Sequence, residues 1–266
     1  MADAGMAPTT KKRKSRLGRN VKRALAKVRG KAAFRAEFER FDRMAKQAGA
    51  RFPMTWDERY PCLTDDTGSY PFAGHYVQHT AWAARKVAAL SPESHTDIGS
   101  SLYFSALVSA FVPVKFYDLR PAEAPFDGLE TGHADLMKLP FEDDSIASLS
   151  CMHVVEHIGL GRYGDTMDPD GDLTAISELK RVTTPGGSLL FVVPVGRPRI
   201  QFNAHRVYSY EQVVEAFEGF TLAECALLPD GPNDTRLIDD PTPGQVNAQA
   251  YGCGCFRFVK TQPGDV

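Results

Sequence analysis

The strongest constraint on the fold is a near-continuous apolar segment at 188–193, with the sequence Ser-Leu-Leu-Phe-Val-Val. An apolar run without polar alternation is typical of a strand that is covered on both faces. Other short apolar segments precede and follow it, and stretches with helical spacing separate most of them. This alternation predicts an α/β fold with a mostly parallel sheet between helices.

The expected elements can be placed along the chain. We expect strands at 96–98, 114–117, 132–136, 146–152, 188–193, 221–228 and 251–259, and helices at 102–111, from about 153, at 173–182 and at 210–217. Only a loop at 229–244, rich in Pro, Gly and Asp, separates the last two strands. Because consecutive strands without a crossover helix can pair antiparallel, the sheet is expected to end in an antiparallel pair.

The charge is distributed unevenly between the N-terminal part and the remainder. Residues 1–50 contain 15 Lys or Arg and 4 Asp or Glu, a net charge of +11, whereas the whole chain carries −2 and the remainder therefore −13. Residues 1–30 are basic and poor in large apolar side chains, which predicts a mostly disordered arm. The sequence thus indicates an acidic globular part with a basic extension.

A helical cover segment is expected between this arm and the main domain, over residues 31–90. At 31–48, Phe34, Phe38, Phe41 and Ala45 recur with helical spacing and predict an amphipathic helix. Residues 51–74 mix Pro, Gly and aromatic side chains and predict irregular structure, and a second helix is expected at 75–90. The main domain then extends over 91–266.

Cysteine use and hydropathy favour a cytoplasmic location. No apolar run approaches the ~20 residues of a membrane span, and no apolar signal segment follows the charged start. The five cysteines are odd in number and scattered, which is not the pattern of a disulfide framework. Cys253 and Cys255 would share one face of a strand, but no second Cys or His pair stands near them in the sequence, so we predict core thiols and no metal site.

Polar residues follow the ends of the first strands, where an open parallel sheet binds ligands. Asp97 and Gly99 stand at the end of the first strand, and a glycine there lets a ligand approach the backbone. Asp118 ends the next strand, about 20 residues later, where a carboxylate can accept hydrogen bonds from ribose hydroxyls and repel a 2′-phosphate. This spacing indicates a nucleotide-like ligand.

In their order and spacing, several segments resemble the class I S-adenosylmethionine-dependent methyltransferases. They are Asp-Ile-Gly-Ser-Ser at 97–101, Asp118, Asp135-Leu136 followed by Leu-Pro-Phe at 139–141, the strand at 146–152, and the helix, Pro-Gly-Gly turn and strand at 178–191. The resemblance covers residues 95–228 and implies a three-layer Rossmann-like fold with a mostly parallel seven-stranded sheet and an antiparallel last strand. Ser101 and Tyr103 depart from the pattern, since the family has its second and third glycines there.

The resemblance implies that the domain at 91–266 binds S-adenosyl-L-methionine (SAM) as its cofactor. The residues expected to bind it are Asp97, Gly99, Ser100, Asp118, Asp135, Leu136, Met152 and His153. In chain order they would hold the amino-acid end, the ribose and the adenine of the cofactor, and form the floor of its pocket. For His153, a role in capping a helix is an equally good interpretation.

Two loops are expected to bind the acceptor of the methyl group, at 159–172 and 194–206. The residues that we expect to contact it are Arg162, Tyr163, Arg197, Asn203 and Arg206. Asp165, His205 and His157 are the candidates for a general base, which an alcohol acceptor needs. Asp168, Asp170 and Asp172 would fit a hard cation or, more simply, helix capping by Asp170 or Asp172, and we assign no metal to them.

The sequences Arg-Tyr-Gly-Asp, Asp-Pro-Asp-Gly-Asp and Asn-Ala-His-Arg in these loops also resemble an uncharacterised methyltransferase-like group associated with surface-polysaccharide and glycan pathways. We therefore predict a methyltransferase that transfers the methyl group to an oxygen of a sugar or glycan-related acceptor, as in polysaccharide biosynthesis. One alternative is another small-molecule or lipid acceptor. A second is a non-catalytic partner module, which the two replaced glycines suggest. A nicotinamide-dependent dehydrogenase is disfavoured, because no full Gly-x-Gly-x-x-Gly follows the first strand.

The basic arm at 1–30 has three interpretations. It can be a flexible solubilising tail, it can contact an anionic membrane at its inner face, close to lipid-linked acceptors, or it can bind nucleic acid. We expect no nucleic-acid partner, because the acidic main domain contains no recognised nucleic-acid module.

Overall fold

The computed structural model describes residues 16–49, 52–62, 74–123, 126–231, 236–262 and 264. The chain divides into two compact units, Met1–Pro71 and Phe72–Val266, which are described separately. The first fifteen residues of the basic arm lie outside the described residues. Among the helices that are described, none is both long enough and apolar enough to cross a membrane.

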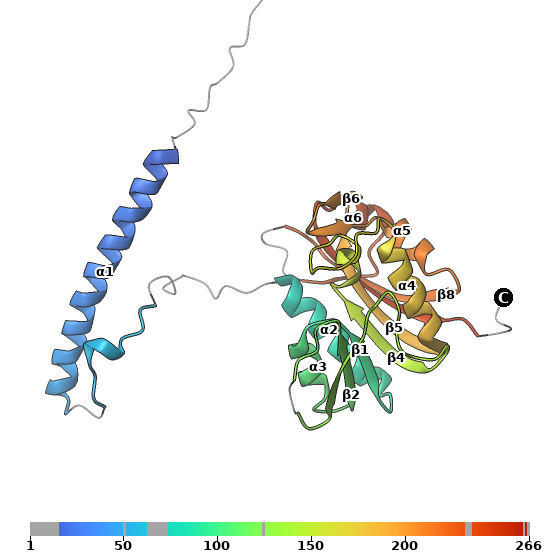
Figure 1. Ribbon diagram of the computed structural model, residues 1–266, viewed down its shortest axis with the longest axis horizontal. Helices are drawn as coiled ribbons and strands as arrows, with labels where there is room; N and C mark the ends of the chain where they lie inside the picture. Colours follow the sequence, from blue (N-terminus) through green and yellow to red (C-terminus); the bar gives the residue numbers. More distant parts are fainter. Residues whose placement is uncertain are drawn as a thin grey trace, which may run out of the picture. The chain divides into compact units, whose positions relative to one another are not determined.

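The first unit contains a long helix, α1 (Arg16–Gln47), and a short 3-10 helix, η1 (Trp56–Glu58) (Figure 1). The helix begins inside the range 1–30, so the expectation of disorder is wrong for residues 16–30. The physical reason is composition: this stretch has no proline and is rich in Ala, Leu, Lys and Arg, which are strong helix formers whatever their charge.

The side chain of Trp56 packs the segment that follows α1 against α1 itself. Its ring lies 5.0 Å from that of Phe38 in an edge-to-face arrangement and 6.1 Å from that of Phe34. The guanidinium groups of Arg59 and Arg35 lie over the same indole, at 4.3 and 5.1 Å. The amphipathic pattern around Phe34 and Phe38 therefore has a partner inside this unit.

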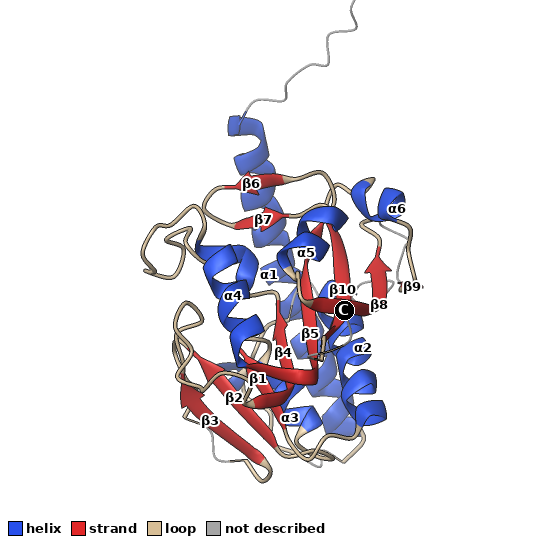
Figure 2. Ribbon diagram, turned by 90° about the vertical axis from the view of Figure 1, so that its right-hand side faces the viewer, coloured by secondary structure: helices blue, strands red, loops and turns tan. Residues whose placement is uncertain are grey.

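The second unit is an α/β sheet domain with the strand order β3-β2-β1-β4-β5-β10-β8-β9 (Figure 2). Its strands are β1 (His95–Ile98), β2 (Val114–Asp118), β3 (Leu129–His133), β4 (Ile146–Met152), β5 (Thr183–Val195), β8 (Phe220–Leu228), β9 (Ile238–Asp239) and β10 (Gly252–Lys260). The first five strands of the order pair parallel, and β10 is antiparallel to both β5 and β8. The predicted fold class is confirmed, with the two-residue β9 as an additional edge strand.

Helices cover both faces of this sheet (Figure 1). They are α2 (Gly74–Leu90), α3 (Leu102–Val108), η2 (Val155–His157), α4 (Gly171–Val182), α5 (Tyr210–Ala216) and α6 (Pro243–Asn247). On β5, Leu189 and Phe191 belong to the core under α4 and α5, whereas Leu190 and Val192 belong to the core under α2 and α3. The apolar run is thus buried on both faces, as its sequence predicts.

Helix α2 packs within the sheet domain through Trp82, Ala83 and Val87. The boundary between the units therefore falls after Pro71, and α2 does not form a common cover segment at 31–90 with α1. The expected loop at 194–206 is also more regular than predicted, because it contains a hairpin of β6 (Arg199–Gln201) and β7 (His205–Val207).

The helix that we expected from about residue 153 is absent. Strand β4 is followed by η2, a single 3-10 turn, and by a loop that reaches α4. Gly159, Gly161 and Gly164 have φ angles of 78°, 68° and 84°, which a helix cannot accommodate. A Cβ at Gly159 would lie 2.1 Å from the carbonyl oxygen of Asp168, so the loop folds back on itself too closely for any other residue.

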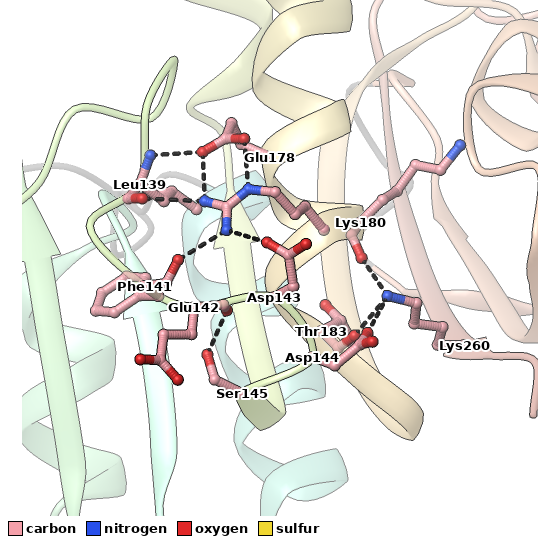
Figure 3. A network of polar contacts seen from close by, with 11 residues as sticks. Leu139, Phe141, Glu142, Asp143, Asp144, Ser145, Glu178, Lys180, Thr183 and Lys260 are labelled. Carbon is pink, nitrogen blue, oxygen red and sulfur yellow. Dashed lines mark hydrogen bonds and ion pairs between the residues drawn. The ribbon is translucent and has the colours of Figure 1, made fainter.

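Arg181 links the segment between β3 and β4 to helix α4. The residues that it bonds are labelled in Figure 3. Its guanidinium donates to both carboxylate oxygens of Glu178 at 2.7 Å, to Asp143 at 2.8 Å, and to the carbonyl oxygens of Phe141 and Leu139 at 2.7 and 3.0 Å. Glu178 in turn accepts from the backbone N–H of Leu139 at 2.8 Å. The ion pair thus holds the backbone that leads from Asp135 and Leu136 to β4.

We expect Arg181→Met to lower the free energy of unfolding by about 2–3 kcal/mol, because several charge-assisted hydrogen bonds are lost and the Glu178 carboxylate loses its counter-charge. Urea unfolding followed by circular dichroism measures the change. Lys138→Met, at an exposed position of the same segment, is the control and should change stability by less than about 0.5 kcal/mol. Equal effects in the two variants would contradict the role of Arg181.

Candidate functional site

Two neighbouring cavities open where β1, β2 and β4 end. The strand-end cavity has a volume of 370 Å³, and its lining includes Asp118, Asp135, Leu136, Val154 and Asp165. The histidine cavity has a volume of 580 Å³, and its lining includes His75, Tyr76, Glu156, Arg162, His205 and Tyr251. Gly99, His153, His157 and Tyr163 line both. The two cavities therefore share a wall at the carboxyl ends of the parallel strands, the edge where such sheets bind ligands.

Gly99 lies at the turn from β1 to α3 with a φ angle of 69°. A Cβ at this position would lie 3.1 Å from Cγ1 of Val154 and 3.8 Å from Oδ2 of Asp118. Both neighbours line the strand-end cavity, so a side chain here would be strained and would occupy the space of a ligand. The predicted role of Gly99 as a point of close approach agrees with this geometry.

Asp118 and Asp135 lie on the wall of the strand-end cavity. One oxygen of each is held by the backbone two residues on: Oδ1 of Asp118 accepts from Arg120 at 2.7 Å, and Oδ1 of Asp135 accepts from Met137 at 2.9 Å. Within the described residues the second oxygen of each carboxylate has no hydrogen-bond partner. The side chains are thus oriented while each keeps an acceptor for a ligand.

Asp97 lies beneath the cavities and lines neither of them, so its contact with the cofactor stays a prediction. It is fully buried; Oδ1 accepts from the backbone of Ser100 at 3.1 Å, and Oδ2 accepts from the hydroxyl of Ser150. His95 extends this chain, since its Nε2 lies 2.9 Å from the Ser150 hydroxyl. Burial raises the pKa of Asp97 to about 7 and lowers that of His95 to about 4. Asp97 therefore positions the turn that contains Gly99.

Ser100 and Met152 line the histidine cavity next to this turn, rather than the strand-end cavity. The hydroxyl of Ser100 accepts from the backbone N–H of Met152 at 3.0 Å, which joins the first turn to the end of β4. Both residues lie at the site, and the hydrogen bond of Ser100 is a structural one.

The carboxylate of Asp165 organises the loop after η2. Oδ2 accepts from the backbone of Gly159 at 2.8 Å and Gly161 at 3.3 Å, and Oδ1 accepts from Tyr163 at 3.1 Å. Although partial burial raises the pKa of Asp165, these backbone hydrogen bonds lower it overall. A carboxylate that is already bonded at both oxygens and has a lowered pKa is a weak base, so the geometry favours a structural role.

Arg206, which was expected to contact the acceptor, lines neither of the two cavities. It is 5% exposed, donates to the carbonyl oxygens of Ile158 at 2.6 Å and Pro169 at 2.9 Å, and lies 3.4 Å from the carboxylate of Asp172. Asp172 also accepts from the hydroxyl of Tyr208 at 2.9 Å, so it is not the cap of α4. Arg206 is thus a buried clamp of the loop.

The other loop residues divide into two groups. Arg162 and Tyr163 line the histidine cavity, with the guanidinium of Arg162 5.0 Å from the Tyr163 ring. Arg197 and Asn203 are exposed and line neither cavity, because the β6–β7 hairpin turns them away. Asp170 precedes α4 at the N-cap position, but its side chain makes no capping hydrogen bond.

Glu156 is the central residue that the sequence interpretation missed. Its carboxylate is 1% exposed; Oε1 lies 2.9 Å from Nδ1 of His153 and 3.7 Å from Nε2 of His157, whereas Oε2 has no hydrogen-bond partner within the described residues. The available signal was its place between two histidines. His75 and Tyr251 also line the histidine cavity, and nothing in their local sequence indicates it.

The candidate bases His157 and His205 face the histidine cavity together, with ring centroids 6.4 Å apart. Nδ1 of His157 lies 2.6 Å from the carbonyl oxygen of Ala204, so it carries the proton and Nε2 is the basic atom. Nε2 of His205 lies 2.6 Å from Oε1 of Gln201. Burial lowers the pKa of His205, which keeps this ring neutral near pH 7.

Comparison with known proteins finds one family model that matches part of the chain, and several similar solved structures. The model of the family described as "Caenorhabditis protein of unknown function, DUF268" matches residues 140–226. No curated protein matches the sequence. Similar solved structures include a chain of the Haloferax volcanii complex between the Trm112 methyltransferase activator and a proposed methyltransferase, at 19% identity over 71% of this chain and 91% of that chain, with a TM-score of 0.49.

A second similar structure is the Burkholderia thailandensis 1,6-didemethyltoxoflavin-N1-methyltransferase with bound 1,6-didemethyltoxoflavin and S-adenosylhomocysteine. It is 15% identical over 69% of this chain and 79% of that chain, with a TM-score of 0.49. A Thermotoga maritima SAM-dependent methyltransferase is 16% identical over 70% of this chain and 92% of that chain, with a TM-score of 0.47. Because likenesses at this level do not decide a reaction, the activity is inferred from the residues of the two cavities.

We expect Asp97→Asn to change how stability depends on pH. The pKa of Asp97 is about 7 in the fold and 3.8 in the unfolded chain, so the folded protein holds an extra proton in between and loses stability as pH rises from about 4 to 7. Relative to the Asn variant, the wild type should lose about 4 kcal/mol across this window.

Urea unfolding at a series of pH values measures this difference. Asp127→Asn, at an exposed position two residues before β3, is the control and should follow the wild-type curve. Parallel pH profiles for wild type and Asp97→Asn would show that Asp97 is ionised in the fold.

Proposed function

We propose that this protein is a SAM-dependent methyltransferase. The observation that supports it best is the shared wall between two cavities at the ends of β1 and β4, one lined by Asp118 and Asp135 and the other by ionisable side chains. Methyl transfer needs such an arrangement, because the cofactor and the acceptor must lie on opposite sides of the reacting carbon. Bound SAM would supply a methyl group activated by a positively charged sulfur.

The strand-end cavity suits an adenosine group. The free oxygen of Asp118 can accept hydrogen bonds from ribose hydroxyls, and Asp135 can accept one from the adenine amino group beside the apolar Leu136. The bare backbone of Gly99 leaves room where the two cavities meet. Each of these groups is fixed by the fold before a ligand arrives, which lowers the entropic cost of binding.

His157 is our proposed general base. It lies in the wall shared by the two cavities, and the Ala204 carbonyl fixes the tautomer that leaves Nε2 free to take a proton. Oε1 of Glu156, 3.7 Å from Nε2, stabilises the imidazolium that forms. His205 is the second candidate, since it is neutral and lines the acceptor side. Asp165 is less suitable because its oxygens are occupied by backbone N–H groups.

A hydroxyl-rich acceptor, such as a sugar, fits the histidine cavity best. Tyr76, Tyr163 and Tyr251 supply aromatic surface and hydroxyl groups, and Arg162 supplies a planar set of donors. A sugar offers both apolar C–H faces and many hydrogen-bonding groups. Another small molecule or a lipid headgroup with a free hydroxyl is the alternative acceptor.

The basic arm at 1–30 is proposed to bring the protein to an anionic membrane surface. Its charge supports this, because residues 1–50 carry a net +11 against −13 in the remainder. Residues 16–30 form the first part of α1, and residues 1–15 lie outside the described residues.

The test of the cofactor is isothermal titration calorimetry with SAM and with its demethylated product. We expect binding by the wild type and a roughly 10- to 100-fold loss of affinity in Asp118→Ala, because the hydrogen bonds of a carboxylate to the ribose are lost. Asp127→Ala, exposed at the opposite end of the sheet, should bind as the wild type does. A wild-type protein that binds neither compound would exclude the methyltransferase and favour a partner module.

The test of the base is methyl transfer from radiolabelled SAM to fractionated cell extract, followed by mass spectrometry of the methylated compound. We expect His157→Gln to lower turnover about 10²- to 10⁴-fold while SAM affinity changes little. His133→Gln, an exposed histidine at the end of β3, is the matched control. If only His205→Gln abolishes turnover, His205 and not His157 is the base.

A further inference from the structure

Three potential metal ligands that are far apart in the sequence meet at the end of β4. They are His79 on α2, His153 after β4 and Cys253 on β10, and their ligand atoms all lie within 4.8 Å of one another. Sγ of Cys253 lies 3.5 Å from Nε2 of His153. A tetrahedral zinc ion with bonds of 2.3 Å to sulfur and 2.0–2.1 Å to nitrogen spaces these atoms ~3.6 Å apart.

Both imidazoles are oriented as metal-bound histidines usually are. Nδ1 of His79 donates to the carbonyl oxygen of His75 at 2.6 Å, and Nδ1 of His153 bonds to the carboxylate of Glu156 at 2.9 Å. Each bond leaves Nε2 as the atom available to the cluster. A ligand histidine almost always bonds its other nitrogen to a carbonyl or a carboxylate in this way.

Charge and burial favour a cation at this position. His79, Glu156 and Cys253 are at most 1% exposed, and Oε2 of Glu156 has no hydrogen-bond partner within the described residues. A divalent ion bound to a thiolate, with the Glu156 carboxylate behind His153, gives a site without net charge. Buried charges are stable when they are compensated in this way.

We propose that His79, His153 and Cys253 bind one transition-metal ion, with zinc as the best fit to two imidazoles and a thiolate. A fourth position remains for water or another ligand. The ion would fix α2 and β10 to the end of β4 and set the orientation of the His153 ring, which lines both cavities. The metal site shares His153 and Glu156 with the walls of the two cavities, but its proposal does not depend on the proposed methyl transfer.

A nucleophilic triad is the competing interpretation, because Cys253, His153 and Glu156 stand in the order thiol, imidazole and carboxylate. Two observations oppose it. The thiol is 0% exposed and lines neither cavity, so a substrate has no access to it. His79 places a second imidazole nitrogen beside the thiol, and a thiol–imidazole–carboxylate triad does not require one.

The test is metal binding by the untagged full chain with the exposed Cys62 replaced by Ser. Metal content after dialysis is measured by mass spectrometry, and the protein stripped of metal is titrated with Co²⁺. We expect one equivalent of zinc, and with Co²⁺ a sulfur-to-metal charge-transfer band together with the intense visible bands of tetrahedral geometry. Competition with a zinc chelator gives the affinity.

Three variants and one control decide the assignment. Cys253→Ser should abolish the charge-transfer band, His79→Gln should weaken binding but retain the band, and Glu156→Gln should lower zinc affinity about 10- to 100-fold. Cys225→Ser removes a buried thiol of the opposite core and should behave as the parent protein. Circular dichroism checks the fold; if Cys253→Ser does not fold, His79→Gln and Glu156→Gln still test the site.

Three results would overturn the proposal. They are substoichiometric zinc in the parent protein, a charge-transfer band that survives Cys253→Ser, and unchanged zinc affinity in both His79→Gln and Glu156→Gln. None of these measurements uses SAM, so failure of the metal site is distinguishable from failure of the proposed methyl transfer.

Discussion

The hydrogen bond between Glu156 and His153 is the interaction on which the site depends. A carboxylate at 1% exposure needs positive charge beside it, and at 2.9 Å the Nδ1 of His153 is the nearest source. This bond fixes the chain as it leaves β4, where His153 has a φ angle of 56°, and directs Nε2 toward Cys253. The same carboxylate lies beside His157, so one buried charge orients both histidines of the shared wall.

The loop after η2 forms the opposite side of the site and is held from within. The carboxylate of Asp165 accepts hydrogen bonds from three backbone N–H groups of the loop. The guanidinium of Arg206 donates to carbonyl oxygens at both ends of the loop. The backbone N–H and C=O groups of such a loop are not paired in a helix or sheet, so charged side chains supply their hydrogen-bond partners. Asp165 and Arg206, which the sequence suggested as functional residues, therefore stabilise the backbone of the loop. Arg162 and Tyr163 line the histidine cavity.

The sheet was predictable because its strands are marked by local runs of apolar residues, whereas the site depends on burial and on contacts between distant residues. The apolar run at 188–193 indicates a strand covered on both faces, and Asp118 stands at the end of a recognisable strand. A sequence shows that position 97 is an aspartate, but not that it lies beneath the turn. Cys253 is 100 residues from its partner His153, so no spacing rule brings the two together.

The geometry of the turn from β1 to α3 explains why Ser101 and Tyr103 can stand where the family pattern has glycines. Of the residues around it, Gly99 needs a positive φ angle, at 69°. Ser101 has an extended backbone with φ −69°, which any residue adopts, and Tyr103 lies on α3 with 86% of its surface exposed. Side chains at these positions cost no strain and do not fill the strand-end cavity, whose lining includes neither, although Ser101 lines the histidine cavity. The departure from the family pattern therefore leaves the proposed adenosine site open.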